Sequence, residues 1–263
     1  MTDADSFGYC RLDRDGAVLT ITITRPEVLN SLHLPAHVEL ERAFDVYAAD
    51  PELRVAIITG AGDRAFCVGT DLKSLAVTGN YEYPPGGFAG ITTRFDLWKP
   101  VIAAVNGLCL GGGVEIVAAC DLAVAAEHAE FALPEPRVGL AALGGGALQR
   151  LARQMPMKDA MWLVLTGSRI AAAEALRMSL VNAVVPRGDA LAGAQALARE
   201  LLACAPLALE ASKQVMLQSV AEPDLAAAMR RRYPAAERML ASEDALEGPR
   251  AFAEKRKPQW QGR

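Results

Sequence analysis

The feature that most constrains this chain is a long apolar segment, Pro100 to Cys120 (PVIAAVNGLCLGGGVEIVAAC), in which Glu115 is the only Asp, Glu, Lys, Arg or His. A folded chain keeps an isolated carboxylate out of water only where it has a partner, a raised pKa or a task, because burying it costs several kcal/mol. Gly111 to Gly113 precede Glu115 and a helical apolar pattern follows it, which places the carboxylate in the first turn of a helix. Free backbone N–H groups and the helix dipole attract anions at such a helix start. The segment therefore predicts a buried acid beside an anion-binding turn.

A second acid, Glu135, stands between Pro134 and Pro136 in AEFALPEPRVGL, after a short strand-like stretch. The prolines fix φ and remove backbone donors, so this segment should be a stiff edge that presents a side chain. Two acids in rigid, apolar surroundings suit general acid and base catalysis near neutral pH, since burial and mutual repulsion separate their pKa values. The structural alternative for either acid is a helix cap or an ion pair in the core.

Composition favours one large globular domain with an appended element. The 263 residues are 52% hydrophobic and 22% charged, and we expect an α/β core over residues 1–190 and a helical region over 191–263. A net charge of −4 with dispersed Lys and Arg argues against a nucleic-acid partner. Five scattered cysteines indicate a reducing compartment, with the cytoplasm as the expected location. The acidic start of the chain resembles no targeting signal, and no apolar run is long enough to predict a membrane segment.

Strand-like and helix-like patterns alternate over the first part of the chain, which indicates an α/β architecture with parallel strands. The expected strands are a hairpin of Tyr9–Leu12 with Ala17–Arg25, then Val55–Gly60, Val101–Val105, Leu122–Ala126 and Leu180–Val185; the expected helices are Pro35–Ala49, one entered near Thr70, Gly87–Leu97 and one from Gly112. Three further helices are expected in Ala190–Cys204, Pro206–Val220 and Leu225–Leu240. No strand remains for these last helices to cover, so we expect them to pack on the domain's flank or on another subunit of an oligomer. The Gly- and Pro-rich segment Thr78–Gly90 is either a lid or a surface loop.

Two loops lead from strands into helices, one at Thr70 and one at Gly112. Their backbone N–H groups could together form an oxyanion hole, which needs two donors aimed at one oxygen. The chain has no G-x-G-x-x-G, no P-loop GK[ST] and no G-x-S-x-G, so dinucleotide, nucleotide-hydrolysis and serine-nucleophile mechanisms lose their main support. His33 and His37 have helical spacing, but we expect neither a metal nor another cofactor.

Four ordered motifs resemble the enoyl-CoA hydratase/isomerase superfamily: RPEVLNSL, AFCVGTDLK, KPVIAAVNGLCLGGGVEIVAACD and FALPEPRVGL. With LTGSRIAAAEALRMSLVNAVVP and the terminal FAEKRKP, the resemblance extends from about Gly16 to Pro258. It implies the α/β crotonase (ClpP-like) fold, a spiral of ββα units with a C-terminal helical oligomerisation region. It also implies a homotrimer or a dimer of trimers that acts on an acyl-CoA thioester, with coenzyme A as part of the substrate.

The resemblance assigns roles to particular residues. The amides of Thr70 and Gly112 match the oxyanion hole, and Glu115 and Glu135 match the two glutamates that handle water in hydratases of this family. The positions expected along coenzyme A are Val28, Ala65, Asp71, Lys73, Phe252 and Lys255, and the last two are expected to complete the site, either within one subunit or from a neighbouring one. The alternative for Lys255, with Arg256 and Lys257, is a solvated basic tail. Thr70 and Val68 replace small alanines, and Gly139–Arg150 departs from the usual length of a loop that lines the acyl pocket. The activity implied is hydration of a trans-2-enoyl-CoA to a 3-hydroxyacyl-CoA, with an enoyl-CoA isomerase, a carnitinyl-CoA-type dehydratase and a non-catalytic scaffold as the alternatives.

Overall fold

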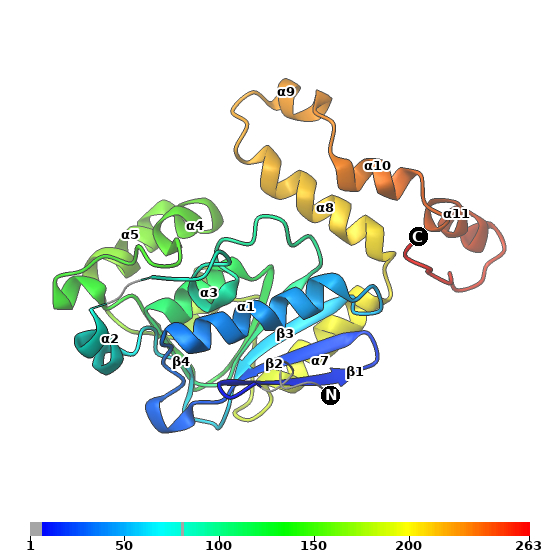
Figure 1. The fold of residues 1–263 in the computed structure, drawn as a ribbon. Helices are drawn as coiled ribbons and strands as arrows, with labels where there is room; N and C mark the ends of the chain where they lie inside the picture. Colours follow the sequence, from blue (N-terminus) through cyan, green and yellow to red (C-terminus); the bar gives the residue numbers. More distant parts are fainter. Residues whose placement is uncertain (1–6, 80–81) are drawn as a thin grey trace. The chain divides into compact units, whose positions relative to one another are not determined.

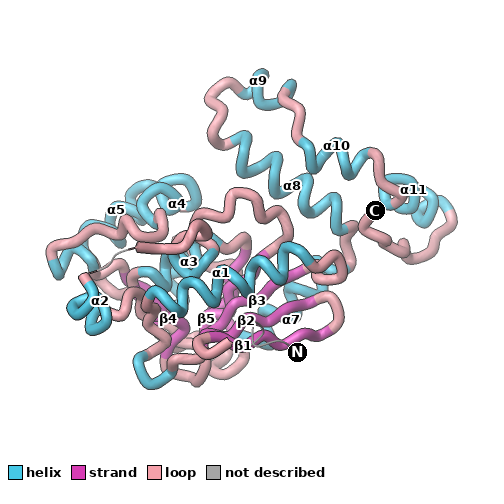
Figure 2. The backbone as a smooth tube through the Cα atoms, in the orientation of Figure 1, coloured by secondary structure: helices cyan, strands magenta, loops and turns pink. Residues whose placement is uncertain are grey.

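The computed structural model describes residues 7–79 and 82–263, which form two compact units (Figures 1 and 2). One unit consists of Met1–Arg94 with Val101–Leu197, and the other of Phe95–Pro100 with Ala198–Arg263. Strands and helices alternate in the first unit, which confirms the α/β class expected from the sequence. The division into domains at residue 190 stays a prediction.

The larger sheet has six strands in the order β1-β2-β3-β5-β7-β10. Its strands are β1 (Cys10–Asp15), β2 (Val18–Ile23), β3 (Val55–Gly60), β5 (Val101–Val105), β7 (Leu122–Ala126) and β10 (Ala183–Val185). Only β1 runs antiparallel, because it forms the predicted hairpin with β2; the other pairs are parallel. The central strands β3 and β5 are buried along their whole length, as parallel strands covered on both faces must be.

A smaller sheet has the order β4-β6-β8-β9. Its strands are β4 (Ala65–Cys67), β6 (Leu108–Leu110), β8 (Glu130–Ala132) and β9 (Ile170–Ala171), and the first three run parallel. Each of these three follows a strand of the larger sheet, β3, β5 and β7 in turn, which is the repeating ββ step of the expected spiral. Carboxyl ends of parallel neighbours meet at one edge of a sheet, so the loops after β4, β6 and β8 come together.

Helix α1 (Leu34–Ala49) shows how the sequence secures this unit. Pro35 occupies the first turn, where its missing N–H costs nothing. The buried side chains of α1 recur at helical spacing and include Leu40, Phe44 and Tyr47. They pack the helix against β1, β2 and the segment Phe88–Gly90.

The remaining helices of this unit are α2 (Leu72–Thr78), α3 (Gly112–Ala119), α4 (Ala147–Gln154), α5 (Met157–Thr166) and α6 (Ala172–Arg177), and α7 (Ala190–Leu202) leads out of it. The helices predicted after Thr70 and from Gly112 are therefore confirmed as α2 and α3. Three short single-turn helices also occur: η2 (Pro26–Val28), η3 (Phe88–Gly90) and η4 (Glu135–Val138).

The predicted helix at Gly87–Leu97 is wrong. Gly87, Ala89 and Gly90 have positive φ angles of 78°, 53° and 65°, which a right-handed helix cannot contain. A Cβ atom on Gly90 would overlap the backbone of Glu41 in α1. This segment is therefore shaped by close approach to α1 and forms only the short helix η3.

The second unit contains α8 (Pro206–Ser219), α9 (Leu225–Arg230), α10 (Pro234–Leu240) and α11 (Asp244–Ala253). The single helix expected over Leu225–Leu240 is wrong, because Pro234 starts a new helix after an extended Tyr233. Helices α8 and α10 pack together, and Gln214 Oε1 accepts a hydrogen bond of 2.8 Å from the N–H of Ala235.

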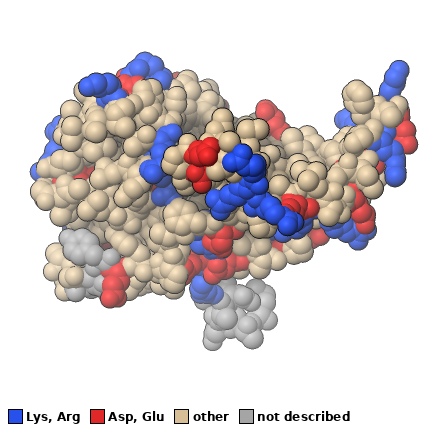
Figure 3. Space-filling model, turned by 90° about the horizontal axis from the view of Figure 1, so that it is seen from above, with Lys and Arg blue, Asp and Glu red and all other residues tan. Residues whose placement is uncertain are grey.

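No helix among residues 7–79 and 82–263 is long and apolar enough to span a membrane. Figure 3 shows one face on which acidic and basic side chains lie beside one another amid a mostly uncharged surface. This agrees with the dispersed Lys and Arg of the sequence. Asn80 and Tyr81, in the segment expected to be a lid or loop, lie outside the described residues.

Gly90→Ala should destabilise the protein by about 2–5 kcal/mol, because it combines a strained φ with overlap of Glu41. Gly16→Ala is the matched control: its φ is also positive, at 55°, but no atom lies within 4 Å of the added Cβ, so a loss of about 1 kcal/mol is expected. Urea unfolding measures both. Equal losses for the two variants would contradict the close packing of this segment on α1.

Candidate functional site

The loops after β4 and β6 bring Thr70 and Gly112 next to each other. A Cβ atom built on Gly69 would lie 2.9 Å from the backbone nitrogen of Gly112. Gly69 has a φ of +89°, a conformation that glycine adopts without strain. The structure therefore brings together the two residues whose amides the sequence singled out.

Both N–H groups are available. Leu32 forms a parallel bridge with Thr70 by donating to the carbonyl of Gly69 and accepting from the N–H of Asp71, so the N–H of Thr70 points away from Leu32. Gly112 is the first residue of α3, and its N–H has no carbonyl within the helix to bind. Neither N–H has a hydrogen-bond partner among the described residues.

The start of α3 is fixed by packing on its glycines. A Cβ atom on Gly112 would overlap the ring of Phe88, and one on Gly113 would overlap the carbonyl oxygen of Cys67 in β4. The requirement for glycine is therefore steric at both positions. Without side chains at these positions, α3 packs directly against β4 and η3, and these neighbours fix the direction of the Gly112 N–H.

Glu115 is 3% exposed and lies in the first turn of α3, as predicted. Its Oε1 accepts a hydrogen bond of 3.3 Å from the N–H of Ala147 at the start of α4. Burial raises the pKa of Glu115, while the amides of Gly145 and Ala147 and the charge of Arg150 oppose that rise. The donors stabilise the ionised form, so Glu115 is a buried acid that can hold a negative charge.

Glu135 begins η4, on the stiff proline-flanked segment after β8. Its Oε2 is buried and has no hydrogen-bond partner among the described residues. Burial raises the pKa of Glu135, and the charge of Glu115 raises it further. The protonated form of Glu135 is therefore favoured relative to an ordinary glutamate.

The two carboxyl groups flank the first turn of α3. A Cβ atom on Gly111 would lie 2.9 Å from Oε1 of Glu135, and one on Gly145 would lie 2.9 Å from Oε2 of Glu115. Their environments differ, since only Glu115 accepts hydrogen bonds from backbone amides of the Gly145–Ala147 segment. Two buried acids in different surroundings beside two free N–H groups can bind an oxyanion and move protons next to it.

A cavity of about 180 Å³ opens beside Thr70. Its lining comes from the start of α1, the start of α2 and the segment after α2: Leu32, His33, Leu34, Pro35, His37, Thr70, Asp71, Ser74, Leu75, Glu82 and Tyr83. A Cβ atom on Gly144 would lie 2.8 Å from the hydroxyl of Tyr83 and 3.5 Å from Oε2 of Glu115. Thr70 thus lines the cavity, while Glu115 lies outside its lining and is linked to it through the backbone of Gly144.

A turn at Arg25–Leu32 organises three of the positions expected along coenzyme A. Asn30 Nδ2 donates to the carbonyl of Ala65 at 2.8 Å, and the guanidinium of Arg25 forms an ion pair of 3.0 Å with Asp71. Val28 lies half-buried in η2 within this turn. Asp71 also accepts the N–H of Ser74 and so caps α2.

The other three expected positions are exposed. Lys73 lies on the first turn of α2. Phe252, 87% exposed on α11, and Lys255, just beyond that helix, belong to the second unit. Their role toward coenzyme A stays a prediction.

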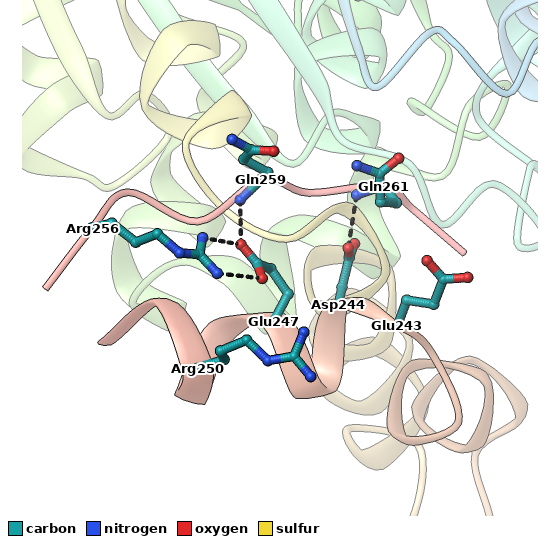
Figure 4. Close-up of a pocket in the computed structure, with 7 residues that line it drawn as sticks. All are labelled: Glu243, Asp244, Glu247, Arg250, Arg256, Gln259 and Gln261. Carbon is teal, nitrogen blue, oxygen red and sulfur yellow. Dashed lines mark hydrogen bonds and ion pairs between the residues drawn. The ribbon is translucent and has the colours of Figure 1, made fainter. Parts of the chain in front are cut away.

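The second unit has its own polar hollow of about 240 Å³ (Figure 4). Here Asp244 accepts the N–H groups of Gln261 and Gly262, while Glu247 accepts the guanidinium of Arg256 and the N–H of Gln259. These carboxylates hold the end of the chain against α11. The hollow therefore has a structural explanation and lacks the open donors found beside Glu115.

The sequence analysis did not single out Arg150, Asn30 or Ala147. Arg150 is half-buried and donates to the carbonyls of Gly145 and Thr92, which supports the segment that contacts Glu115. The sequence did offer a signal for Arg150, because it is the only charged residue in the stretch GLAALGGGALQR. Asn30 gave no comparable signal, because its left-handed φ of 56° follows from the folded turn.

The structure superimposes closely on known structures of the crotonase fold. An enoyl-CoA hydratase from Mycobacterium marinum superimposes with a TM-score of 0.91 and 40% identity, covering 97% of this chain and 99% of that chain. A carnitinyl-CoA hydratase from Mycobacterium avium superimposes with a TM-score of 0.78 and 42% identity, covering 98% and 100%.

The family model for enoyl-CoA hydratase/isomerase matches residues 13–263, and the chain belongs to that family. Members of this family act on acyl-CoA thioesters. The carnitinyl-CoA dehydratase of Salmonella arizonae is 46% identical over 260 residues, covering 96% of this chain and 98% of the relative. That of Salmonella typhi is 44% identical with the same coverage. The family and fold expected from the sequence are thus confirmed.

Glu135→Gln should stabilise the protein increasingly as the pH rises. A carboxyl group whose pKa is raised by folding contributes stability below its ordinary pKa, and that contribution is lost as the pH passes through the raised value. The amide cannot ionise, so the variant avoids this loss. Urea unfolding at pH 4, 6 and 8 should show a variant-minus-wild-type difference that grows with pH. A pH-independent difference for Glu135→Gln would contradict the raised pKa.

Proposed function

We propose that this protein is a hydro-lyase that reversibly adds water across the α,β double bond of an enoyl-CoA thioester, and that it acts as a dehydratase of the carnitinyl-CoA type. The observation that carries the proposal is the placement of two carboxyl groups, Glu115 and Glu135, around two available N–H groups, Thr70 and Gly112. The relatives named carnitinyl-CoA dehydratase, which match nearly the full chain, support the choice within the family.

In this mechanism the thioester oxygen lies between the N–H groups of Thr70 and Gly112. The oxygen becomes negative as an enolate forms, and two preorganised donors stabilise that charge; removing one such donor typically costs roughly 10²–10³ in rate. Both donors are held by rigid packing on Gly69, Gly112 and Gly113.

The carboxyl groups share the two proton transfers. In hydration, ionised Glu115 takes a proton from water as the oxygen bonds to C3, and protonated Glu135 gives its proton to C2; dehydration reverses both steps. The amide donors around Glu115 and the unpartnered Oε2 of Glu135 support this assignment. Water supplies both added groups, so the reaction needs neither a redox cofactor nor a metal.

Hydration is favoured over double-bond migration because it uses two acids, whereas an isomerase needs only one proton shuttle. On the coenzyme A side, we propose contacts along Val28, Ala65, Asp71 and Lys73, with Phe252 and Lys255 as further contacts. We also propose a cytoplasmic homotrimer or dimer of trimers. Exposed apolar side chains of the second unit support an oligomer, among them Met216, Leu217, Leu225 and Met229.

The wild-type protein should hydrate crotonyl-CoA, measured as loss of the ultraviolet absorbance of the enoyl thioester. Glu115→Gln and Glu135→Gln should each lower kcat by about 10²–10⁴, because each removes one proton-transferring group. Glu130→Gln should keep the wild-type rate. Near-wild-type hydration by either active-site variant would refute the two-acid mechanism, and migration of the double bond without hydration would favour an isomerase.

A further inference from the structure

The peptide group that joins Gly145 to Gly146 lies between a buried acid and a half-buried cation. A Cβ atom on Gly145 would lie 2.9 Å from Oε2 of Glu115, and one on Gly146 would lie 2.8 Å from Nη1 of Arg150. Gly146 also has a positive φ of 76°, which glycine adopts without strain. The two glycines therefore let one stretch of backbone approach both side chains closely.

Arg150 holds one side of this peptide. Its Nη1 donates a hydrogen bond of 2.9 Å to the carbonyl of Gly145. Its Nη2 donates to the carbonyl of Thr92, a buried residue that follows η3. The planar guanidinium thus joins α4 to the segment after η3, and its two bonds fix the direction from which it meets the Gly145 carbonyl.

The other side of the same peptide faces Glu115. The Gly145 carbonyl and the Gly146 N–H belong to one planar trans group, so they point in opposite directions. With the carbonyl bound to Arg150, the N–H is directed to the side of Glu115. Burial raises the pKa of Glu115, and the N–H groups of the Gly145–Ala147 segment oppose that rise, as does the charge of Arg150.

A peptide between two glycines meets little steric resistance to rotation. Half a turn of the Gly145–Gly146 peptide would aim its carbonyl oxygen at Glu115 in place of an N–H. A carbonyl and a carboxylate are both acceptors, so no hydrogen bond could form between them. The bond from Arg150 opposes this rotation, because the rotated carbonyl would point away from the guanidinium.

We propose that Arg150 is a positioning residue for Glu115: it locks the Gly145–Gly146 peptide with its N–H toward the carboxylate, which keeps Glu115 oriented as the proton acceptor. Arg150 acts on Glu115 through this peptide and through its own charge, and it takes no part in the proton transfers. The inference rests on the proposed function for the catalytic role of Glu115, whereas the link from Arg150 to Glu115 can be tested without turnover.

Other titratable groups face Arg150 and Glu115 from neighbouring elements. They include Glu135 on η4, Cys120 directly after α3 and Tyr83 in the segment after α2. All of them are retained when Arg150 is replaced. A pH-dependent change in such a variant therefore reports on the loss of Arg150.

Urea unfolding at pH 4, 6 and 8 tests the link without turnover. Removing Arg150 should favour the protonated form of Glu115, so the stability lost in Arg150→Met should grow as the pH rises and Glu115 ionises. In a Glu115→Gln background this growth should disappear, because the amide cannot ionise. A loss that is independent of pH, or that grows equally in both backgrounds, would overturn the proposal.

Hydration of crotonyl-CoA tests the consequence for catalysis. Arg150→Met should lower kcat about 10- to 100-fold with KM changed less than about threefold, because misdirecting a catalytic group costs rate more than binding. The acidic limb of its kcat–pH profile should move to higher pH, since Glu115 must be ionised to accept a proton. Arg150→Lys keeps the charge and a donor, so its kcat should be severalfold above that of Arg150→Met. Arg153→Gln, which removes an exposed cation on the same helix that donates to Gln149, should keep the wild-type kcat.

A loss of rate in Arg150→Met without movement of the acidic limb would overturn the positioning role, as would a wild-type kcat. Arg150→Gln is a second uncharged variant that should behave alike, so the test holds even where Arg150→Met does not fold. In either case, continued hydration by the wild type would leave the proposed function intact. Failure of the wild type to hydrate crotonyl-CoA would refute that function, and the unfolding series would still decide whether Arg150 acts on Glu115.

Discussion

The parallel pairing of three short strands is the constraint on which the site depends. Cys67 of β4 is in register with Cys109 of β6, which is in register with Phe131 of β8. Parallel strands end at the same edge, so the residues that follow them must converge although they are far apart in the sequence. The geometry around Gly112 is therefore a property of the backbone arrangement, and side chains then decide what chemistry it carries.

The proposed chemistry depends on the different surroundings of two buried acids, Glu115 and Glu135. Glu115 accepts backbone donors from the Gly145–Ala147 segment, which Arg150 braces, whereas Glu135 lies on a proline-flanked segment with one oxygen unpartnered. Burial raises both pKa values, whereas the amide donors oppose the rise at Glu115 and the charge of Glu115 adds to the rise at Glu135. A pair with separated affinities can hold one proton at rest, which is the starting condition for moving hydrogen between carbon and oxygen.

The parts of the fold that were predictable have strong local patterns. The strands of the larger sheet and α1 follow from apolar runs and helical spacing, and the position of Glu115 in the first turn of α3 follows from the glycines before it. The smaller sheet was not foreseen, since strands of two or three residues are too short to show an alternating pattern. The helix predicted at Gly87–Leu97 failed for a tertiary reason, because contact with α1 imposes positive φ angles there. The ring contact between His37 and Tyr83 was likewise hidden, because these residues approach each other only through folding.

The contact between Phe88 and Gly112 links two positions that are distant in the chain. The ring occupies the space that any side chain at residue 112 would need, and the same ring orients Tyr83 and His37. A larger residue at 112 would be tolerated only with a smaller one at 88, and that exchange would also loosen the packing of His37 and Tyr83 on Phe88. Residues 88 and 112 are thus mechanically coupled, so the packing of η3 cannot change without a matching change at the start of α3.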